Sequence, residues 1–391
     1  MESALPDLQA RAVLPLTDHL LEEILVRIGA PADLARVSAA CKAFRRLTTD
    51  PAFLRRYRSL HPPLLLGFVS YQRFVAAEAP RPEAPAARAV ARAIDFSTEQ
   101  LPDRGPRGWF RCDLRDGREL LMSAVYEGRP VLPALAVRDP LARVYTLLPP
   151  VPGNLLATIL DEAGDEHNHV FHAFFDSSGD FEEAQFRVIC WTHCTGIAVV
   201  FVYSSVSGIW SLGTTANWDA LGFNIEPGDI LGPDVRWPNH AYGCSYWLLL
   251  IKNKLLKFDI KRMEFSIVGI PPIHQNQIVV VVEAGEGKVG MCSLDYAKPL
   301  HFSVIQNEED NDEHPVETTV PLPVNYSCFL AGAVAGYISV MGLARNSKVE
   351  SGIFLLEIKK LKIEKVCSAS TFDSFSLPYF GFPPSMSPRR I

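Results

Sequence analysis

The chain lacks the features that would point to a membrane, a secretory route or a nucleic-acid partner. Its 391 residues carry a formal net charge of −6, and so modest a balance gives no strong attraction to nucleic acid or to an anionic membrane. No stretch approaches the roughly 18 to 20 apolar residues of a membrane span. Residues 1–20 contain early acidic residues and no uninterrupted apolar core. We therefore expect an intracellular protein, in the cytoplasm, the nucleus or both.

Closely spaced cysteine pairs are also missing. The eight cysteines form no CxxC motif and are scattered through apolar segments. Without a secretory signal, we expect reduced, buried thiols rather than disulfides. Hydrophobic residues make up 48% of the chain and charged residues 21%, which fits a globular protein with a substantial core.

The chain does have one strongly amphipathic segment near its start, "LTDHLLEEILVRIG" at 16–29, where apolar residues recur with a helical period. Thr17 or Asp18 can cap this helix by accepting a backbone hydrogen bond, and Gly29 followed by Pro31 ends it. The segment predicts the first of three short helices.

Two further helices are predicted before residue 58. One begins at Asp33 and carries an apolar stripe that ends at Phe44, and the other begins with Asp50 as its cap and Pro51 in its first turn. Three short helices form only a small core, which cannot bury all of their apolar residues. We expect a partner to cover the surplus; the alternative is that these residues pack only against the rest of the chain.

The sequence pattern changes to short strand-like runs between Trp109 and about Cys367. A strand–turn–strand unit is clearest in "ALAVRDPLARVYTLLPPVP" at 134–152 and recurs at 198–214 and 246–272. Such repetition is typical of a β-propeller, and the segment 64–391 has room for six or seven blades of roughly 45 to 55 residues. A β-sandwich with extra sheets is the alternative. The Ala- and Pro-rich stretch 75–93 is expected to be a flexible loop, and the fold class to be α+β with two domains.

Possible metal ligands occur in two places. His167, His169 and His172 lie near one another in the sequence, but His169 and His172 would face opposite sides of a strand. In "CWTHC", Cys190 and Cys194 would share a strand face about 13 Å apart, too far for one metal ion. Neither group supplies a tetrahedral ligand set, so we expect no metal and no cofactor.

Other charged or glycine-rich segments have structural explanations. "VVEAGEGKVG" at 281–290 lacks the order of a phosphate-binding loop and is interpreted as the turn of a β-hairpin. The acidic run 307–315 is interpreted as a solvated loop without a calcium site. No Ser–His–Asp set or carboxylate pair can be assembled, so an enzyme is not expected. The solvent faces of the helices account for a basic set formed by Arg45, Arg46, Arg55, Arg56 and Arg58.

The N-terminal segment, at 14–58, resembles an F-box, the helical module that docks a receptor onto a Skp-type adaptor of a cullin ubiquitin ligase. The matching stretches are "LTDHLLEEILVRI", "DLARVSAACKAFRRL" and "TDPAFLRRY". Three positions depart from the family pattern: Thr17 and Gly29 stand where proline is frequent, and Phe44 where tryptophan is usual. The resemblance implies adaptor contacts from Leu16, Leu20, Leu21, Ile24, Leu34, Val37, Phe44 and Leu47.

The segment 64–391 resembles the associated region of grass F-box proteins, through "HPPLLLGF", "VRDPLARVYTLLPPVP", "VVEAGEGKVGMCSL" and "LPYFGFPPSMSP". The two resemblances together imply a non-catalytic substrate receptor of a Skp–cullin–F-box ubiquitin ligase, whose β-propeller recruits a target protein of unknown identity. The alternatives are a propeller enzyme, of the galactose-oxidase-like or glycosidase kind, and a ligand-binding propeller with a purely structural helical segment.

Overall fold

The computed structural model describes residues 16–29, 31–61, 64–70, 73–102, 108–123, 132–156, 170–177, 185–193, 197–222, 239–249, 253–295, 299–305, 317–334, 336–368 and 376–381. The chain forms two compact units that divide between Pro63 and Leu64. The first unit is helical and the second is built almost entirely of strands. Within the described residues, no helix is both long enough and apolar enough to cross a membrane.

The described part of the helical unit contains four helices rather than the three expected from the sequence. They are α1 (Asp18–Leu25), α2 (Pro31–Ala40), α3 (Lys42–Thr48) and α4 (Pro51–Leu60). The second predicted helix is broken at Cys41, whose backbone is extended and whose Sγ accepts a hydrogen bond from the N–H of Phe44 at 3.4 Å. Cys41 therefore caps α3 in the position that Ser, Thr or Asp usually occupies.

Two of the predicted helix starts are confirmed. The Thr17 hydroxyl accepts a hydrogen bond from the N–H of Leu20 at 3.4 Å. The Asp50 carboxylate accepts hydrogen bonds from two backbone N–H groups of the first turn of α4, at 2.8 and 3.2 Å, and Pro51 opens that helix. These caps satisfy donors that the helices themselves leave unpaired.

The core of the helical unit is small and well defined. Its buried residues are Leu25, Val26, Leu34, Phe53, Leu54 and Tyr57. The hydroxyl of the buried Tyr57 donates to the carbonyl of Ile28 at 2.7 Å, and the His61 ring bonds the carbonyl of Val26 at the same distance. Both bonds fasten α4 to the end of α1, where carbonyls lack partners within the helix.

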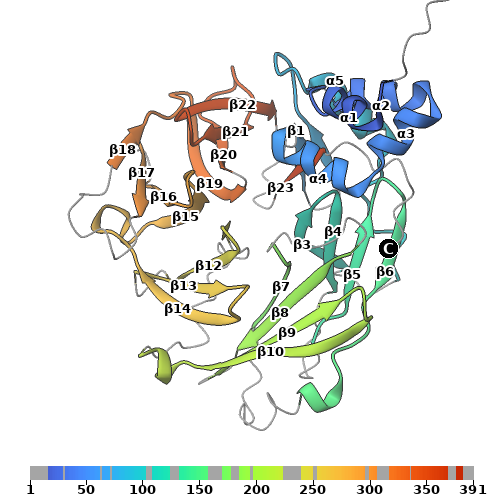
Figure 1. Ribbon diagram of the computed structural model, residues 1–391. Coiled ribbons are helices and arrows are strands. Elements are labelled where there is room, and N and C mark those ends of the chain that lie inside the picture. The colour runs from blue at the N-terminus through green and yellow to red at the C-terminus, as the bar shows by residue number, and fades with distance from the viewer. Residues whose placement is uncertain are drawn as a thin grey trace, which may run out of the picture. The chain divides into compact units, whose positions relative to one another are not determined.

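The β unit is a six-bladed propeller, which confirms the predicted fold and excludes the β-sandwich. Six antiparallel sheets follow one another around a ring (Figure 1), and the innermost strand of a blade contacts that of a neighbouring blade. Blade 2 contains β3 (Trp109–Arg115), β4 (Arg118–Ser123), β5 (Leu135–Asp139) and β6 (Val144–Leu147). Blade 3 contains β7 (Val170–Phe175), β8 (Arg187–His193), β9 (Ile197–Ser204) and β10 (Ile209–Asn217).

The next three blades repeat this order, with the first strand of each innermost. Blade 4 contains β11 (Asn239–Ala241), β12 (Cys244–Leu249), β13 (Lys254–Asp259) and β14 (Glu264–Gly269). Blade 5 contains β15 (Ile278–Glu283), β16 (Val289–Leu294), β17 (Leu300–Ile305) and β18 (Glu317–Val320). Blade 6 contains β19 (Tyr326–Val334), β20 (Tyr337–Ala344), β21 (Gly352–Glu357) and β22 (Lys362–Ser368).

Blade 1 closes the ring by combining the two ends of the β unit. It contains β1 (Leu64–Val69), β2 (Phe74–Ala76) and the last described strand, β23 (Leu377–Gly381), in the order β2-β1-β23. The antiparallel register runs from Leu64 opposite Gly381 to Val69 opposite Leu377. Since β23 also contacts β3 of blade 2, the C-terminal strand supplies the innermost position of this blade.

The stretch 75–93 is an ordered part of blade 1 rather than the flexible loop expected from its composition. It continues β2 and then forms the helix α5 (Ala84–Ala93). Ala87 is fully buried and packs in the same cluster as Phe68, with Val90 against it. Alanine has the highest helix propensity, and Pro85 is tolerated because it lies in the first turn. The low sequence complexity therefore encodes a helix.

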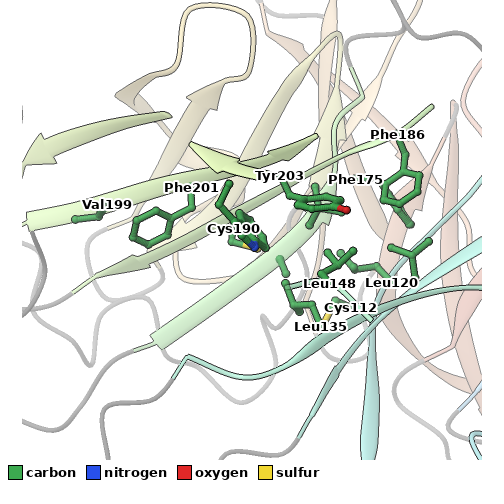
Figure 2. Packing of buried hydrophobic residues seen from close by; sticks show 14 residues of the cluster. Cys112, Leu120, Leu135, Leu148, Phe175, Phe186, Cys190, Val199, Phe201 and Tyr203 are labelled. Carbon is green, nitrogen blue, oxygen red and sulfur yellow. The ribbon is translucent and has the colours of Figure 1, made fainter. Parts of the chain in front are cut away.

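The apolar cores lie between neighbouring blades, as alternation of side chains along the strands predicts. Figure 2 shows the cluster between blades 2 and 3, where Leu120 and Leu135 meet Cys190 and Phe201. A polar contact crosses the same interface, because the Asp113 carboxylate accepts a hydrogen bond from the N–H of Phe175 at 2.8 Å.

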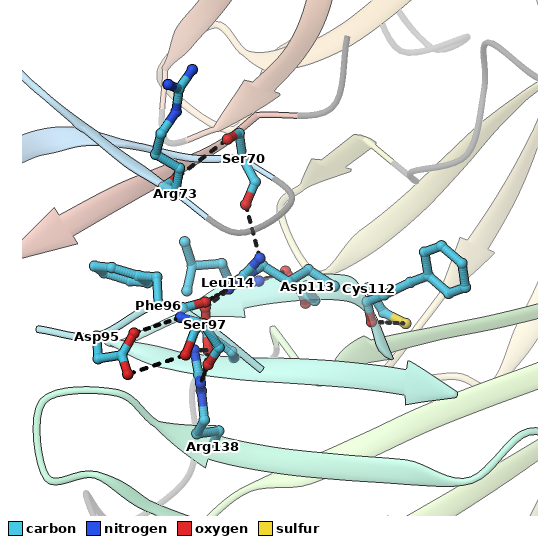
Figure 3. Close-up of polar contacts among 12 residues, drawn as sticks. Ser70, Arg73, Asp95, Phe96, Ser97, Cys112, Asp113, Leu114 and Arg138 are labelled. Carbon is cyan, nitrogen blue, oxygen red and sulfur yellow. Dashed lines mark hydrogen bonds and ion pairs between the residues drawn. The ribbon is translucent and has the colours of Figure 1, made fainter. Parts of the chain in front are cut away.

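Three buried charged residues join blade 2 to blade 1. Glu119 on β4 lies between Arg111 on β3 and Arg138 on β5, with each nitrogen–oxygen contact at 2.6 Å. Arg111 also donates to the carbonyl of Ser70, just after β1, at 2.8 Å. Arg138 donates to the carbonyl of Ser97 (Figure 3). The carboxylate thus neutralises two guanidinium groups whose other donors hold the neighbouring chain segments.

We expect Glu119→Gln to lower the free energy of unfolding by about 3–5 kcal/mol, because two buried guanidinium groups lose their counter-charge while the side-chain volume is kept. Urea denaturation measures this change. The control is Glu357→Gln, which weakens a surface pair with Lys360 at 2.9 Å and should change the free energy by less than about 1 kcal/mol. Equal effects of the two substitutions would contradict a structural role for the buried network.

Candidate functional site

Three of the predicted adaptor contacts form an exposed apolar stripe along α1. Leu16, Leu20 and Ile24 are 52%, 49% and 54% exposed. Leu20 and Ile24 are four residues apart and so share one face of the helix, and Leu16 lies just before the N-cap residue Thr17. We call these three residues the α1 stripe. Leu21 lies off the stripe and is half-buried.

The other four predicted contacts belong to the interior of the unit or to its margin. Leu34 is only 3% exposed and lies in the core with Leu25 and Phe53, so the surface of the unit does not present it. Val37, Phe44 and Leu47 are partly buried and pack against that core. The structure therefore separates an exposed stripe from core residues that the sequence pattern could not distinguish.

Ion pairs connect α1 to two other helices of the unit. Arg46 on α3 pairs with Asp18 at the start of α1. Arg56 on α4 pairs with Glu23 on α1 at 2.6 Å, and this hydrogen bond lowers the pKa of the Glu23 carboxyl. Two arginines of the basic set thus have acidic partners within the unit, as solvent-facing helix charges commonly do. The side chains of Arg55 and Arg58 lie outside the described residues.

The possible metal ligands that lie within the described residues have structural roles in the propeller. His172 is buried on β7 and stacks on Trp191 with ring centroids 4.6 Å apart. Cys190 is buried in the apolar core, and burial raises the pKa of its thiol well above the ordinary value. Of the described residues, no three His, Cys, Asp or Glu lie close enough together to hold a metal ion. His167, His169, Cys194 and the acidic run 307–315 lie outside the described residues.

The glycine-rich segment is a hairpin turn, which confirms the prediction. β15 and β16 pair in antiparallel register on either side of it. Gly285, Glu286 and Gly287 have φ angles of +93°, +52° and +76°, a left-handed conformation that glycine adopts without steric strain. The N–H of Lys288 bonds the carbonyl of Gly285 at 2.9 Å, which closes the turn.

The cysteines that the structure describes are all free thiols. Cys112, Cys190, Cys244, Cys292 and Cys367 are buried, Cys328 is partly exposed and Cys41 is exposed. The expectation of burial is therefore wrong for Cys41, which lies at the solvent-facing start of α3. Burial raises the pKa of the Cys367 thiol to about 12, so this group is protonated at neutral pH and is a poor nucleophile.

Two histidines with lowered pKa values were missed in the sequence. His274, in the short 3₁₀ helix η3 (Pro272–His274), is fully buried between the hydroxyls of Ser293 and Ser303, each at 2.7 Å. Burial, together with the charge of nearby His301, lowers the pKa of His274 to about 4. His240 on β11 bonds the Ser245 hydroxyl at 3.0 Å, and burial lowers its pKa to about 4 as well. Both rings are therefore neutral near pH 7.

The partners of His274 explain why it was missed. Ser293 and Ser303 lie 19 and 29 residues further along the chain, on adjacent strands of blade 5. No local pattern connects them, because the sheet alone brings the two hydroxyls to opposite sides of one ring. With both ring nitrogens occupied by serines, His274 holds the loop before β15 rather than forming a reactive centre.

Comparison with known proteins gives no family for this chain. No family model matches it, and no curated protein matches it. Among solved structures, it is similar to a post-proline cleaving enzyme from Rickettsia typhi, with 11% identity and a TM-score of 0.34 over 70% of this chain and 40% of that one. The chain thus spans less than half the length of that enzyme.

Two further structures show likeness of the same order. An α-L-arabinofuranosidase from Fusarium graminearum matches with 10% identity and a TM-score of 0.37, over 77% of this chain and 85% of that one. The β-propeller domain of the Trilobed protease from Pyrococcus furiosus matches with 8% identity and a TM-score of 0.34, over 66% and 71%. Likeness this distant supports no statement about activity, and the propeller assignment depends on the sheet topology.

We expect His274 to make stability depend on pH. Its pKa is about 4 in the folded chain and about 6.5 when unfolded, so the unfolded state binds the additional proton. The stabilisation is fully present above pH 6.5 and is lost as pH falls toward 4, by up to about 1.4 kcal/mol per pH unit. Urea denaturation between pH 7 and 4 should show a shallower decline for His274→Gln than for wild type. Since His240 titrates in both proteins, identical slopes would contradict this account of His274.

Proposed function

We propose that this chain is a non-catalytic receptor subunit of a Skp–cullin–F-box ubiquitin ligase. The observation that carries the proposal is the α1 stripe, because Leu16, Leu20 and Ile24 are about half exposed while Leu25 on the same helix is buried. A helix with a buried face and an exposed apolar face has surface available for a second protein. The ordered resemblance of 14–58 to an F-box points to a Skp-type adaptor as that partner, and through it a cullin.

The departures from the F-box pattern leave the helical unit intact. Thr17 caps α1, and Phe44 packs against the core as a large apolar residue should at this position. A side chain in place of Gly29 would meet no atom within 4 Å, so this position places no steric demand on the fold. None of the three departures removes a residue of the α1 stripe.

The propeller suits the other half of this function, the capture of a target protein. A ring of blades is a rigid support, and its connecting loops are free to vary and to bind. Such a receptor acts by position: it holds the target near the ubiquitin carrier and raises the effective concentration without making or breaking bonds. The fold does not specify the target, because the side chains of the connecting loops determine which protein is bound.

Replacing Leu20 and Ile24 together by aspartate should weaken binding to a purified Skp-type adaptor by at least about a hundredfold, because each apolar side chain contributes roughly 1.5–3 kcal/mol when buried in an interface. Pull-down followed by calorimetry measures the loss. The control is Leu60→Asp, since Leu60 on α4 is 56% exposed but lies outside the stripe. Circular dichroism verifies that the variants fold. Failure of the wild type to bind at micromolar concentration would contradict the receptor assignment.

A further inference from the structure

Blade 1 differs from the other blades at its outer edge. The five other sheets have four strands each, whereas blade 1 has three among the described residues. Among the described strands, β2 (Phe74–Ala76) is the outermost of this blade and pairs with β1 alone. The outer edge of a sheet presents a row of backbone donors and acceptors that can pair with another strand.

The register of β2 shows which backbone groups face outward. The N–H of Ser70 bonds the carbonyl of Arg73, and the N–H of Ala77 bonds the carbonyl of Leu66, at 2.8 and 2.9 Å. Bonded positions alternate along an antiparallel pair, so Arg73, Val75 and Ala77 direct their backbone groups toward β1. The backbone N–H and C=O groups of Phe74 and Ala76 point away from it, and in the described part of the chain neither has a partner on that side.

A cleft of about 350 Å³ lies along this edge. Beyond β2, it is lined by residues from both flanking elements, including Arg88 of α5 and Ser368 at the end of β22. Glu78, which also lines the cleft, is held in place because its N–H bonds the carbonyl of Val366 at 2.8 Å and its carboxylate accepts from Ser368 at 3.2 Å. The cleft thus lies beside the outer edge of β2, and hydrogen bonds hold the part of its lining formed by Glu78 and Ser368.

The charges around the cleft favour an acidic occupant. Arg73 and Arg88 both line it, and their side chains are exposed. The acidic group in the lining is Glu78, whose carboxylate is held by the Ser368 hydroxyl. Guanidinium groups bind carboxylates through paired, charge-assisted hydrogen bonds. A strand with acidic side chains therefore complements both the backbone edge and the cleft walls.

We propose that this cleft binds an extended acidic segment of a partner protein, which pairs with β2 as the fourth strand of blade 1. Backbone bonds to Phe74 and Ala76 would supply affinity, and Arg88 would select acidic side chains, as in other complexes formed by strand addition. This site is separate from the α1 stripe and needs no adaptor. If the chain is a ligase receptor, as proposed above, this cleft would capture targets. Peptide binding to the cleft and adaptor binding to the α1 stripe are measured separately, so one proposal can fail without the other.

The test is fluorescence anisotropy with the full chain and a labelled peptide of about nine residues in which glutamate alternates with valine. Wild type should bind saturably in the micromolar range, and Arg88→Glu should weaken binding at least about tenfold. The matched control is Arg92→Glu, since Arg92 is exposed one turn further along α5 but does not line the cleft; it should change affinity by less than about twofold. A peptide with lysine in place of glutamate should bind the Arg88→Glu variant more tightly than the glutamate peptide does, because the charges are then complementary again.

A second variant tests the backbone edge independently of charge. Ala76→Pro removes an N–H that points away from β1, so the ladder between β1 and β2 is kept while binding should fall at least about tenfold. The proposal is overturned if the wild type does not bind, or if Arg88→Glu and Arg92→Glu weaken binding equally. It is also overturned if light scattering shows a dimer of the chain that Ala76→Pro dissociates, because the occupant is then a second copy.

Discussion

The antiparallel ladder between β1 and β23 is the constraint on which the β unit depends. It joins the two ends of a segment of more than 300 residues and converts a row of six sheets into a closed ring. Tyr379 of β23 packs edge-on against Phe74 and Phe96, with ring centroids 5.7 and 5.4 Å away. Without β23, blade 1 would lose its innermost strand and expose this aromatic cluster. The Arg111–Glu119–Arg138 network reinforces the same place by fastening the end of β1 to blade 2.

Each proposed binding surface belongs to one element, α1 or β2, that packs on one side and is open to a partner on the other. In the helical unit, Leu25 of α1 lies in the core, whereas Leu16, Leu20 and Ile24 are exposed to solvent. In blade 1, one edge of β2 pairs with β1, and the other edge lies beside the cleft. The core packing of Leu25 in α1 and of Ala87 in α5 holds these faces in place, so a partner would meet preorganised surfaces and lose less conformational entropy on binding.

Local signals in the sequence predicted local structure well. The caps Thr17 and Asp50, the hairpin turn near Gly285 and the repeated strand pairs all depend on residues within a few positions of one another. The break at Cys41 was missed because a thiol is an unusual helix cap, and α5 was missed because Ala and Pro are also common in loops. The fourth helix and the fixed stretch 75–93 are the resulting corrections.

Long-range features could not be predicted, because they depend on pairing across the chain. β23, the three buried charges and the serines around His274 meet their partners only once the ring is formed. The candidate site shows the same limit: Leu20 and Leu34 are both apolar and helical, and only tertiary packing makes one exposed and the other buried. The outer edge of β2 could not be predicted for the same reason, because the order of strands in a sheet depends on pairing between distant segments.

Truncation tests the dependence on ring closure most directly. A chain that ends after Gly381 keeps β23, and a chain that ends after Ser376 lacks it. The first should unfold in urea with a cooperative β-unit transition, because it keeps every described strand of the ring. The second should lose that cooperative transition, because the ring cannot close. Cooperative unfolding of the Ser376 chain with the stability of the Gly381 chain would contradict the central role of the β1–β23 ladder.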